Sequence, residues 1–378
     1  MKKLLIILII LMMSGCYNYK ELNEIAVVSS IAIDKDEDKY LVSAQVMNAK
    51  QEKESENSQV IVFESKGNTI NEALRNMIMK SSRRLYGSHL SKLVISEEVA
   101  KEGIINILDL FQRIPEVRSE LTITIAKDIK AADVIKVMTF PETIPAEYVK
   151  TSIQSADLSS ALTYSTKLDE FVSLYLKDYV DPVVSVVEVR DYKKKGTTTD
   201  NNTTTDPISE IVLENVAITN DSKLEDFLDK NETIGYNFIK DQVDEMIIPV
   251  KCDDTYYSSI SVLKSSTDTK VKKDRNKYKI NINVHSKAVI NEYNCSNDLT
   301  KEKNITDLEK KTEKKVKSYI NKALKKQKEV KSKFLGLERK IYLDYPKYNN
   351  EEYEVDVKVN VELNRKGSVR NSSKGDKD

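Results

Sequence analysis

The chain of 378 residues has no tryptophan, only nine glycines and only two histidines. So few glycines make phosphate-binding and oxyanion loops scarce, and no HExxH, GxSxG or Walker-type motif occurs. The two histidines, His89 and His285, fall in different expected elements, and no spacing among the acidic residues nominates a catalytic pair. The sequence therefore predicts a protein that is not an enzyme and that uses no cofactor and no metal.

An excess of charge of one sign is also missing. The chain has 60 basic and 60 acidic residues, and its local basic runs are offset by neighbouring acids. A nucleic-acid-binding protein that relies on counterion release shows a basic domain or stripe instead. We therefore expect no nucleic-acid partner.

The chain lacks an apolar run long enough to span a bilayer, which takes roughly 20 residues. Its longest run at the N-terminus, Leu4–Met13, follows Lys2 and Lys3. A charged start, a short apolar run and small residues after it are typical of an export signal. We expect residues 1–15 to be a signal peptide that is removed.

Cys16 follows that run in the order Met13-Ser14-Gly15-Cys16, which resembles a bacterial lipobox, although leucine is commoner where Met13 stands. The resemblance implies that Cys16 becomes the first mature residue and carries a diacylglyceryl group. Two acyl chains give stable anchoring, whereas one binds membranes only marginally. An ordinary secretory signal with a coincidental cysteine, or a retained helix, is the alternative.

Only Cys252 and Cys295 remain besides Cys16, and neither lies in a CxxC motif. An exported protein can form this pair as a disulfide, which would close a loop of about 44 residues and contribute roughly 4 kcal/mol. Two isolated thiols are an equally good interpretation.

The first half of the chain alternates between strand and helix patterns. Hydrophobic periodicity over residues 23–140 predicts the order β-β-β-α-β-α-β-α, with a capping box at Thr69 and Glu72 that opens a helix over 69–86. A polar helical region over 145–177 and a buried strand over 181–189 follow. We assign residues 16–190 to an N-terminal α/β domain.

Residues 191–206 are rich in Thr, Asn and Asp, which bury little apolar area, so we expect a polar linker there. A middle β/α module over 207–265, with a helix near 221–230, and a C-terminal α/β domain over 266–368 follow. The longest helical pattern covers 299–335, and the tail 369–378 is expected to be disordered. The fold class is α+β and multidomain, each domain having a largely antiparallel or mixed sheet with packed helices.

One short stretch, residues 81–90, combines Arg83, Arg84, Tyr86 and His89 between an expected helix and an expected strand. Arginine and aromatic side chains are favoured at protein interfaces, so these four residues are candidates for a partner interface. The alternative is structural: one arginine pairs with an acid and His89 packs beside the strand.

Four stretches in order resemble the Ger(x)C family, the lipoprotein C subunits of bacterial spore germinant receptors. They start with CYNYKELNEIAVVSSIAIDK, residues 16–35, and continue over residues 67–118, 213–239 and 345–368. The family often has tryptophan after the lipidated cysteine and near the C-terminal Tyr-Pro, where this chain has Tyr17 and Tyr348.

The resemblance implies three mixed α/β domains and a protein held by its lipid on the outer face of the spore inner membrane. There it would assemble with a polytopic A subunit and a transporter-like B subunit in a complex that senses nutrients. The family has no established enzymatic activity, and whether this subunit binds the germinant is not readable. A solute-binding lipoprotein of an importer is the alternative, which needs a ligand cleft between two similar lobes. An envelope hydrolase is a third interpretation, which needs a nucleophile beside a base.

Overall fold

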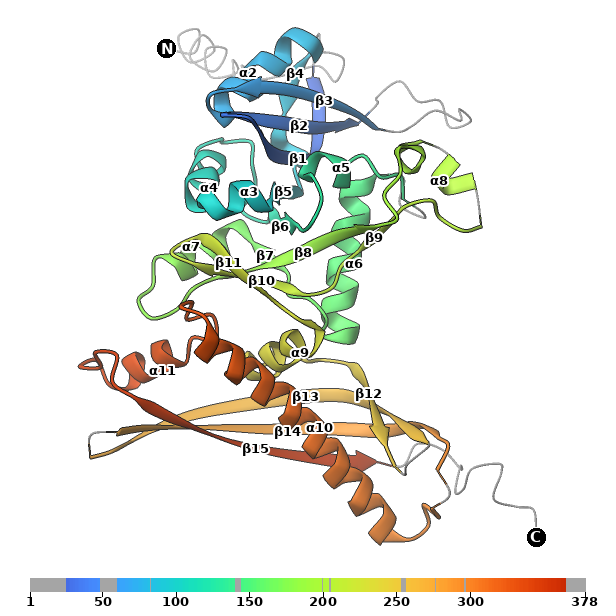
Figure 1. Cartoon of the computed structure of the whole chain (residues 1–378), viewed down its shortest axis with the longest axis vertical. Coiled ribbons are helices and arrows are strands. Elements are labelled where there is room, and N and C mark those ends of the chain that lie inside the picture. Colours follow the sequence, from blue (N-terminus) through green and yellow to red (C-terminus); the bar gives the residue numbers. More distant parts are fainter. Residues whose placement is uncertain are drawn as a thin grey trace, which may run out of the picture.

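The computed structural model describes residues 25–47, 60–81, 83–139, 144–198, 200–203, 205–252, 256–275, 277–295 and 297–364. The molecule is elongated, with the start of the described chain near one end and a four-stranded sheet near the other (Figure 1). The described strands form two sheets with helices packed on them, which confirms the α+β prediction. The expected signal peptide, Cys16 and the tail 369–378 lie outside the described residues.

The larger sheet is mixed. Its central strands run in parallel, and antiparallel hairpins extend it at both edges. Short strands β4, β7 and β9 pair with β1, β6 and β8 off the main path. The main order is β11 (Lys223–Leu228), β10 (Val216–Asn220), β8 (Val183–Arg190), β6 (Thr122–Ala126), β5 (Lys92–Ser96), β1 (Ile25–Asp36), β2 (Lys39–Met47) and β3 (Val60–Gly67), and the short strands are β4 (Arg84–Tyr86), β7 (Thr166–Lys167) and β9 (Glu210–Val212).

Helices cover both faces of this sheet, which explains why its central strands are almost wholly apolar or buried. One apolar core holds side chains of α2 (Ile70–Ser81), α3 (Glu97–Glu102), α4 (Ile105–Gln112) and α7 (Leu168–Tyr175). A second core, on the opposite face, holds side chains of α5 (Ala131–Val134) and α6 (Pro145–Ser160).

The first two strands of the expected order form an antiparallel hairpin. Strands β1 and β2 pair over a turn in which Glu37 has a φ of 55°. The Thr69 hydroxyl accepts the N–H of Glu72 at 3.1 Å, and the Glu72 carboxylate accepts the N–H of Asn68 at 2.8 Å. The capping box therefore opens α2, but its carboxylate reaches one residue further back than the usual geometry.

Two helix predictions are corrected. The helix expected over 69–86 ends at Ser81, because residues 84–86 form β4 and pair with the start of β1. The helix expected near 221–230 is strand β11: Asp221 and Ser222 both have positive φ and make a tight turn from β10. The next helix, α9 (Lys230–Ile239), starts only after Asp229, which forms a capping box with Glu232.

The polar segment 191–206 lies between strands of one sheet. Strands β9 and β10, which follow it, both pair with β8, which precedes it. Asn201 is buried, and its side-chain amide donates to the carbonyls of Met138 and Ser209 at 2.7 and 3.0 Å. The expected limits 16–190, 207–265 and 266–368 stay a prediction about independent folding, which sheet pairing does not test.

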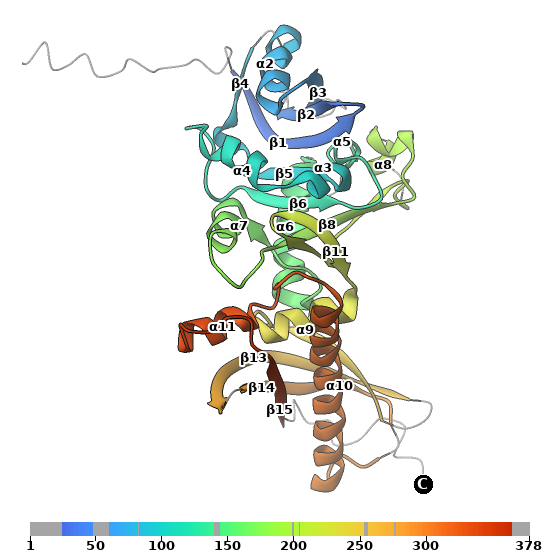
Figure 2. The same ribbon diagram turned by 60° about the vertical axis from the view of Figure 1, so that its left-hand side comes forward.

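The second sheet has four strands in the order β12, β13, β14 and β15, and β14 pairs with β15 in parallel. The helices α9 and α10 (Glu302–Glu329) pack on it with α11 (Leu337–Asp344), and α10 runs along one side of the strands (Figure 2). The strands are β12 (Met246–Lys251), β13 (Tyr257–Asp274), β14 (Lys277–Tyr293) and β15 (Tyr353–Asn364).

The helix expected over 299–335 is shorter at both ends, since α10 covers 302–329. The backbone of Val330 is extended, and two carboxylates accept hydrogen bonds from the backbone N–H groups that follow it. Glu225 accepts the N–H groups of Lys331 and Ser332, both at 2.8 Å, and Asp181 accepts that of Lys333 at 2.7 Å. These contacts join the turn after α10 to the large sheet, which no periodicity within residues 299–335 could reveal.

Candidate partner-docking groove

An apolar groove of about 530 Å³ opens between α2, β4 and the loop after α4. Figure 1 shows these elements toward the end of the molecule where the described chain begins. We call it the α2–β4 groove. Its lining is mostly apolar, with four polar side chains, and consists of Val28, Ile31, Asn71, Leu74, Arg75, Ile78, Met79, Arg84, Leu85, Gly87, Leu90, Phe111, Ile114, Glu116 and Val117.

The groove exists because α2 presents two apolar faces. Ile70, Ala73 and Met77 are buried in the core, as the helical periodicity predicts. Ile78 and Met79 point elsewhere: 46% of Ile78 and 90% of Met79 are exposed. Helical periodicity also predicts Ile78 on that buried face, which is wrong, because Ile78 lies about 100° around the helix axis from Met77 and is half-exposed. Large apolar side chains left exposed beside a groove are typical of an interaction surface.

Cationic side chains border this apolar surface. Arg84 lies 3.6 Å from Glu116, with the two side chains 62% and 26% exposed. Such an exposed pair contributes about 0–1 kcal/mol, so it does not hold the groove shut. Arg75 makes no ion pair with any described residue. A segment that fills this groove would therefore meet an apolar floor and a positive rim.

The four residues predicted as an interface are only partly brought together here. Arg84 lines the groove, whereas Arg83, Tyr86 and His89 are not among its described lining residues. Tyr86 belongs to β4 and pairs through its backbone with Val27, and His89 is exposed at the end of a 3-10 turn. The sequence analysis missed Arg75, Ile78 and Met79, and the only signal for them was a second apolar stripe on α2.

The groove is close to where the described chain begins. Ile25, the first described residue, pairs with Arg84 of β4. Cys16 precedes Ile25 by nine residues, which can span at most about 30 Å. If Cys16 carries a lipid, the groove is therefore held within that distance of the membrane.

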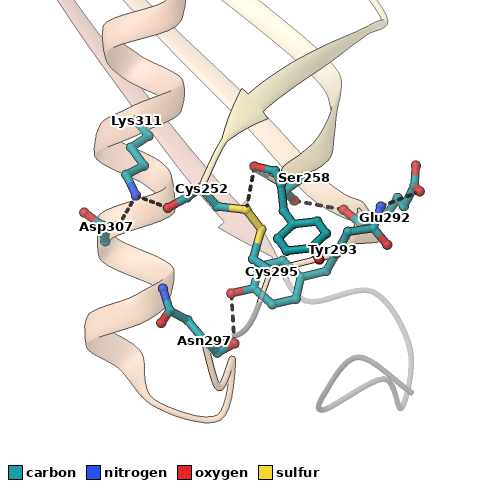
Figure 3. Close-up of a disulfide and its surroundings, with 10 residues drawn as sticks. Cys252, Ser258, Glu292, Tyr293, Cys295, Asn297, Asp307 and Lys311 are labelled. Atoms are coloured by element: carbon teal, nitrogen blue, oxygen red, sulfur yellow. Dashed lines mark hydrogen bonds and ion pairs between the residues drawn. A yellow bond between two sulfur atoms is a disulfide. The ribbon is translucent and has the colours of Figure 1, made fainter. Parts of the chain in front are cut away.

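The structure joins Cys252 and Cys295 by a disulfide that ties the end of β12 to the chain after β14 (Figure 3). Lys311 of α10 donates from Nζ to the Cys252 carbonyl oxygen at 2.7 Å and pairs with Asp307 at 2.8 Å. The disulfide and this lysine together fasten the first half of α10 to the sheet.

A second cavity, of about 990 Å³, lies between α10, α11 and the start of β15. Tyr353 donates its hydroxyl to Glu338 at 2.8 Å, and burial together with the charge of Glu338 raises the pKa of Tyr353. Burial also raises the pKa of Tyr348 to about 12. Both phenols stay protonated at neutral pH, so they act as hydrogen-bond donors rather than as bases.

No group of three metal-ligating side chains forms among the described residues. Within that same part of the chain, every helix is too short or too polar to cross a bilayer.

Comparison with known proteins identifies the family of this chain. Residues 18–189 match the family model described as the spore germination protein N-terminal domain, and residues 214–367 match the spore germination B3/GerAC-like C-terminal model. The chain belongs to this family of spore germination proteins.

Two relatives illustrate the match. Spore germination protein KC of Bacillus subtilis (strain 168) is 27% identical, over 98% of this chain and 96% of its own. Spore germination protein GerQC of Bacillus cereus is 22% identical, over 95% of both chains. The crystal structure of the GerBC protein shares the fold, with a TM-score of 0.51 at 18% identity, over 88% of this chain and 96% of that one.

Proposed function

We propose that this chain is the lipid-anchored C subunit of a nutrient receptor that triggers spore germination, where it acts as a non-catalytic assembly or sensing subunit. The observation that carries the proposal is the match of both halves of the chain to spore germination models. The lipobox-like sequence that ends at Cys16 supports the anchor and, with it, a place on the outer face of the spore inner membrane.

The anchor would act through concentration. A subunit confined to a membrane meets its membrane partners at a raised effective concentration without any new contact. The surfaces of the subunit then determine which partner it binds. We propose that the α2–β4 groove receives an apolar segment of the A or B subunit, and that acidic residues beside that segment meet Arg75 and Arg84.

The test is co-purification of the A and B subunits with this chain from spore membranes. Met79→Glu places a charge on the exposed apolar wall of the groove, so we expect it to reduce co-purification and slow germination at unchanged chain abundance. Leu176→Glu is the matched control, because Leu176 is 75% exposed and lies outside the groove lining. Equal loss in both variants, or loss in neither, would contradict the role of the groove.

The alternative function, a solute-binding lipoprotein, makes a different prediction. A solute at 100 times its dissociation constant would stabilise the isolated chain by about 2.7 kcal/mol. The receptor proposal does not require such a response from this subunit alone. A large thermal shift with one nutrient, without co-purifying A and B subunits, would favour the importer.

A further inference from the structure

The long helix α10 is the most basic element of a chain that is otherwise balanced in charge. Its 28 residues contain ten lysines and five acidic residues, whereas the whole chain has 60 of each sign. Figures 1 and 2 show α10 on the outside of the second sheet, at the end of the molecule away from α2. The excess positive charge is therefore local and lies on the surface.

The acidic residues of α10 do not neutralise its outer face, because several of them point toward the sheet. Glu309 and Glu313 accept the backbone N–H groups of Leu363 and Val361 at 3.1 and 3.2 Å. Both carboxylates thus lie against the free edge of β15. Asp307 pairs with Lys311, whose ammonium group also donates to the backbone near the disulfide.

The outward face carries Lys314, Lys317, Lys322 and Lys325, which we call the lysine stripe. All four are exposed and line a shallow depression of about 430 Å³, together with Ser318 and Asn321. Lys325 lies 3.5 Å from Glu329, but the other three make no ion pair with any described residue. The stripe extends for about 16 Å along the helix.

We propose that the lysine stripe binds the anionic headgroups of a lipid bilayer. A protein partner would fit this surface poorly, because protein interfaces are depleted in lysine and enriched in arginine and aromatic residues, none of which line the depression. Flexible lysines act instead as point charges that suit a fluid array of phosphates, each contributing about 1 kcal/mol near an anionic surface.

The inference rests on the proposed function only for its location, since the anchor would bring the chain to a membrane. Strand β1, where the described chain begins, and α10, which carries the stripe, lie toward opposite ends of the molecule (Figure 1). Contact at both ends would lay the long axis along the bilayer rather than upright. The C-terminal sheet would then lie close to the headgroups.

The test uses the chain from Tyr17 to Asp378, which lacks the expected lipid but keeps every described residue. Co-sedimentation is measured with phosphatidylcholine vesicles that contain or lack phosphatidylglycerol. We expect binding only to the anionic vesicles, and its loss as sodium chloride rises from about 0.1 to about 1 M, which shortens the Debye length from about 10 to about 3 Å. The triple variant Lys314→Glu, Lys317→Glu, Lys322→Glu should bind at least about tenfold more weakly.

A matched control reverses three exposed lysines elsewhere in the same sheet unit, Lys264→Glu, Lys272→Glu and Lys279→Glu, so the change in net charge is identical. The control should retain at least half of the wild-type binding, and circular dichroism should show that both variants are folded. Equal binding to neutral vesicles, or equal loss in both triple variants, would overturn the proposal. Because no lipid anchor is present, either result would leave the proposed receptor function standing.

Discussion

The disulfide between Cys252 and Cys295 permits a quantitative prediction. It joins residues 43 apart in the sequence, with their Cα atoms 6.2 Å apart. Closing a loop of about 44 residues removes chain entropy from the unfolded state worth about 4 kcal/mol. For a folding unit of about 150 residues, 1 kcal/mol corresponds to about 2–4 °C in Tm. We therefore expect reduction to lower the Tm of the C-terminal part by about 8–16 °C.

The assay is thermal unfolding followed by circular dichroism, with and without a phosphine reductant. The double variant Cys252→Ala, Cys295→Ala should melt near the reduced wild type and should not respond to reductant. The Lys311 contact is made to a backbone carbonyl, so this variant keeps it. Two observations together would refute the reasoning. The wild-type Tm would be the same with and without reductant, and Cys252 and Cys295 would both react with a thiol label after unfolding without reductant.

Three further changes test the packing. Lys92 is buried, its Nζ has no hydrogen-bond partner among the described residues, and burial lowers its pKa well below 10.5. The unfolded chain binds more protons than the folded chain between the folded pKa and 10.5, so stability rises with pH there. Lys92→Met should add about 1–3 kcal/mol in urea unfolding at pH 7 and less near pH 10; a loss would contradict this. Gly235→Ala should lower the free energy of unfolding by about 1–3 kcal/mol in the same assay, because the added Cβ would lie 2.6 Å from the carbonyl carbon of Tyr319. An unchanged free energy of unfolding would disprove this close approach of α9 and α10. Asp34→Ala should cost about 3 kcal/mol in chemical unfolding, because both carboxylate oxygens accept N–H groups at 2.8 Å at the start of α5, and wild-type stability would show that this cap is unimportant.

Short-range signals predicted much of the fold. Alternation and helical periodicity located the first three strands and α2, and the Thr69 capping box opened that helix where expected. These features depend on neighbours within a few residues, which a single sequence displays directly. The fold class followed from the order of such elements.

Long-range contacts explain what the sequence did not predict. The end of α10 depends on Glu225 and Asp181, which are about a hundred residues or more away in the chain. The turn at Asp221 and Ser222 makes β11 a strand because β10 offers a free edge, although residues 223–228 have no strong alternation. Such pairings are set by tertiary structure rather than by local propensity.

The candidate groove was only partly predicted, because long-range contacts also decide which side chains line it. Arg84 lines the groove, but Ile78 and Met79 became its wall only because β4 and the loop at 114–117 leave that side of α2 uncovered. The sequence offered two arginines, a tyrosine and a histidine side by side, and proximity in the chain did not bring all four into one surface.

The measurement that tests the central claim most directly is intact mass with membrane fractionation of the protein from spores, for the wild type and for Cys16→Ala. The account predicts a wild-type chain that starts at residue 16, carries a diacylglyceryl group and sediments with the inner membrane, and a variant that lacks the lipid and leaves the membrane. An unmodified wild-type chain in the soluble fraction would contradict the proposal of a membrane-anchored receptor subunit.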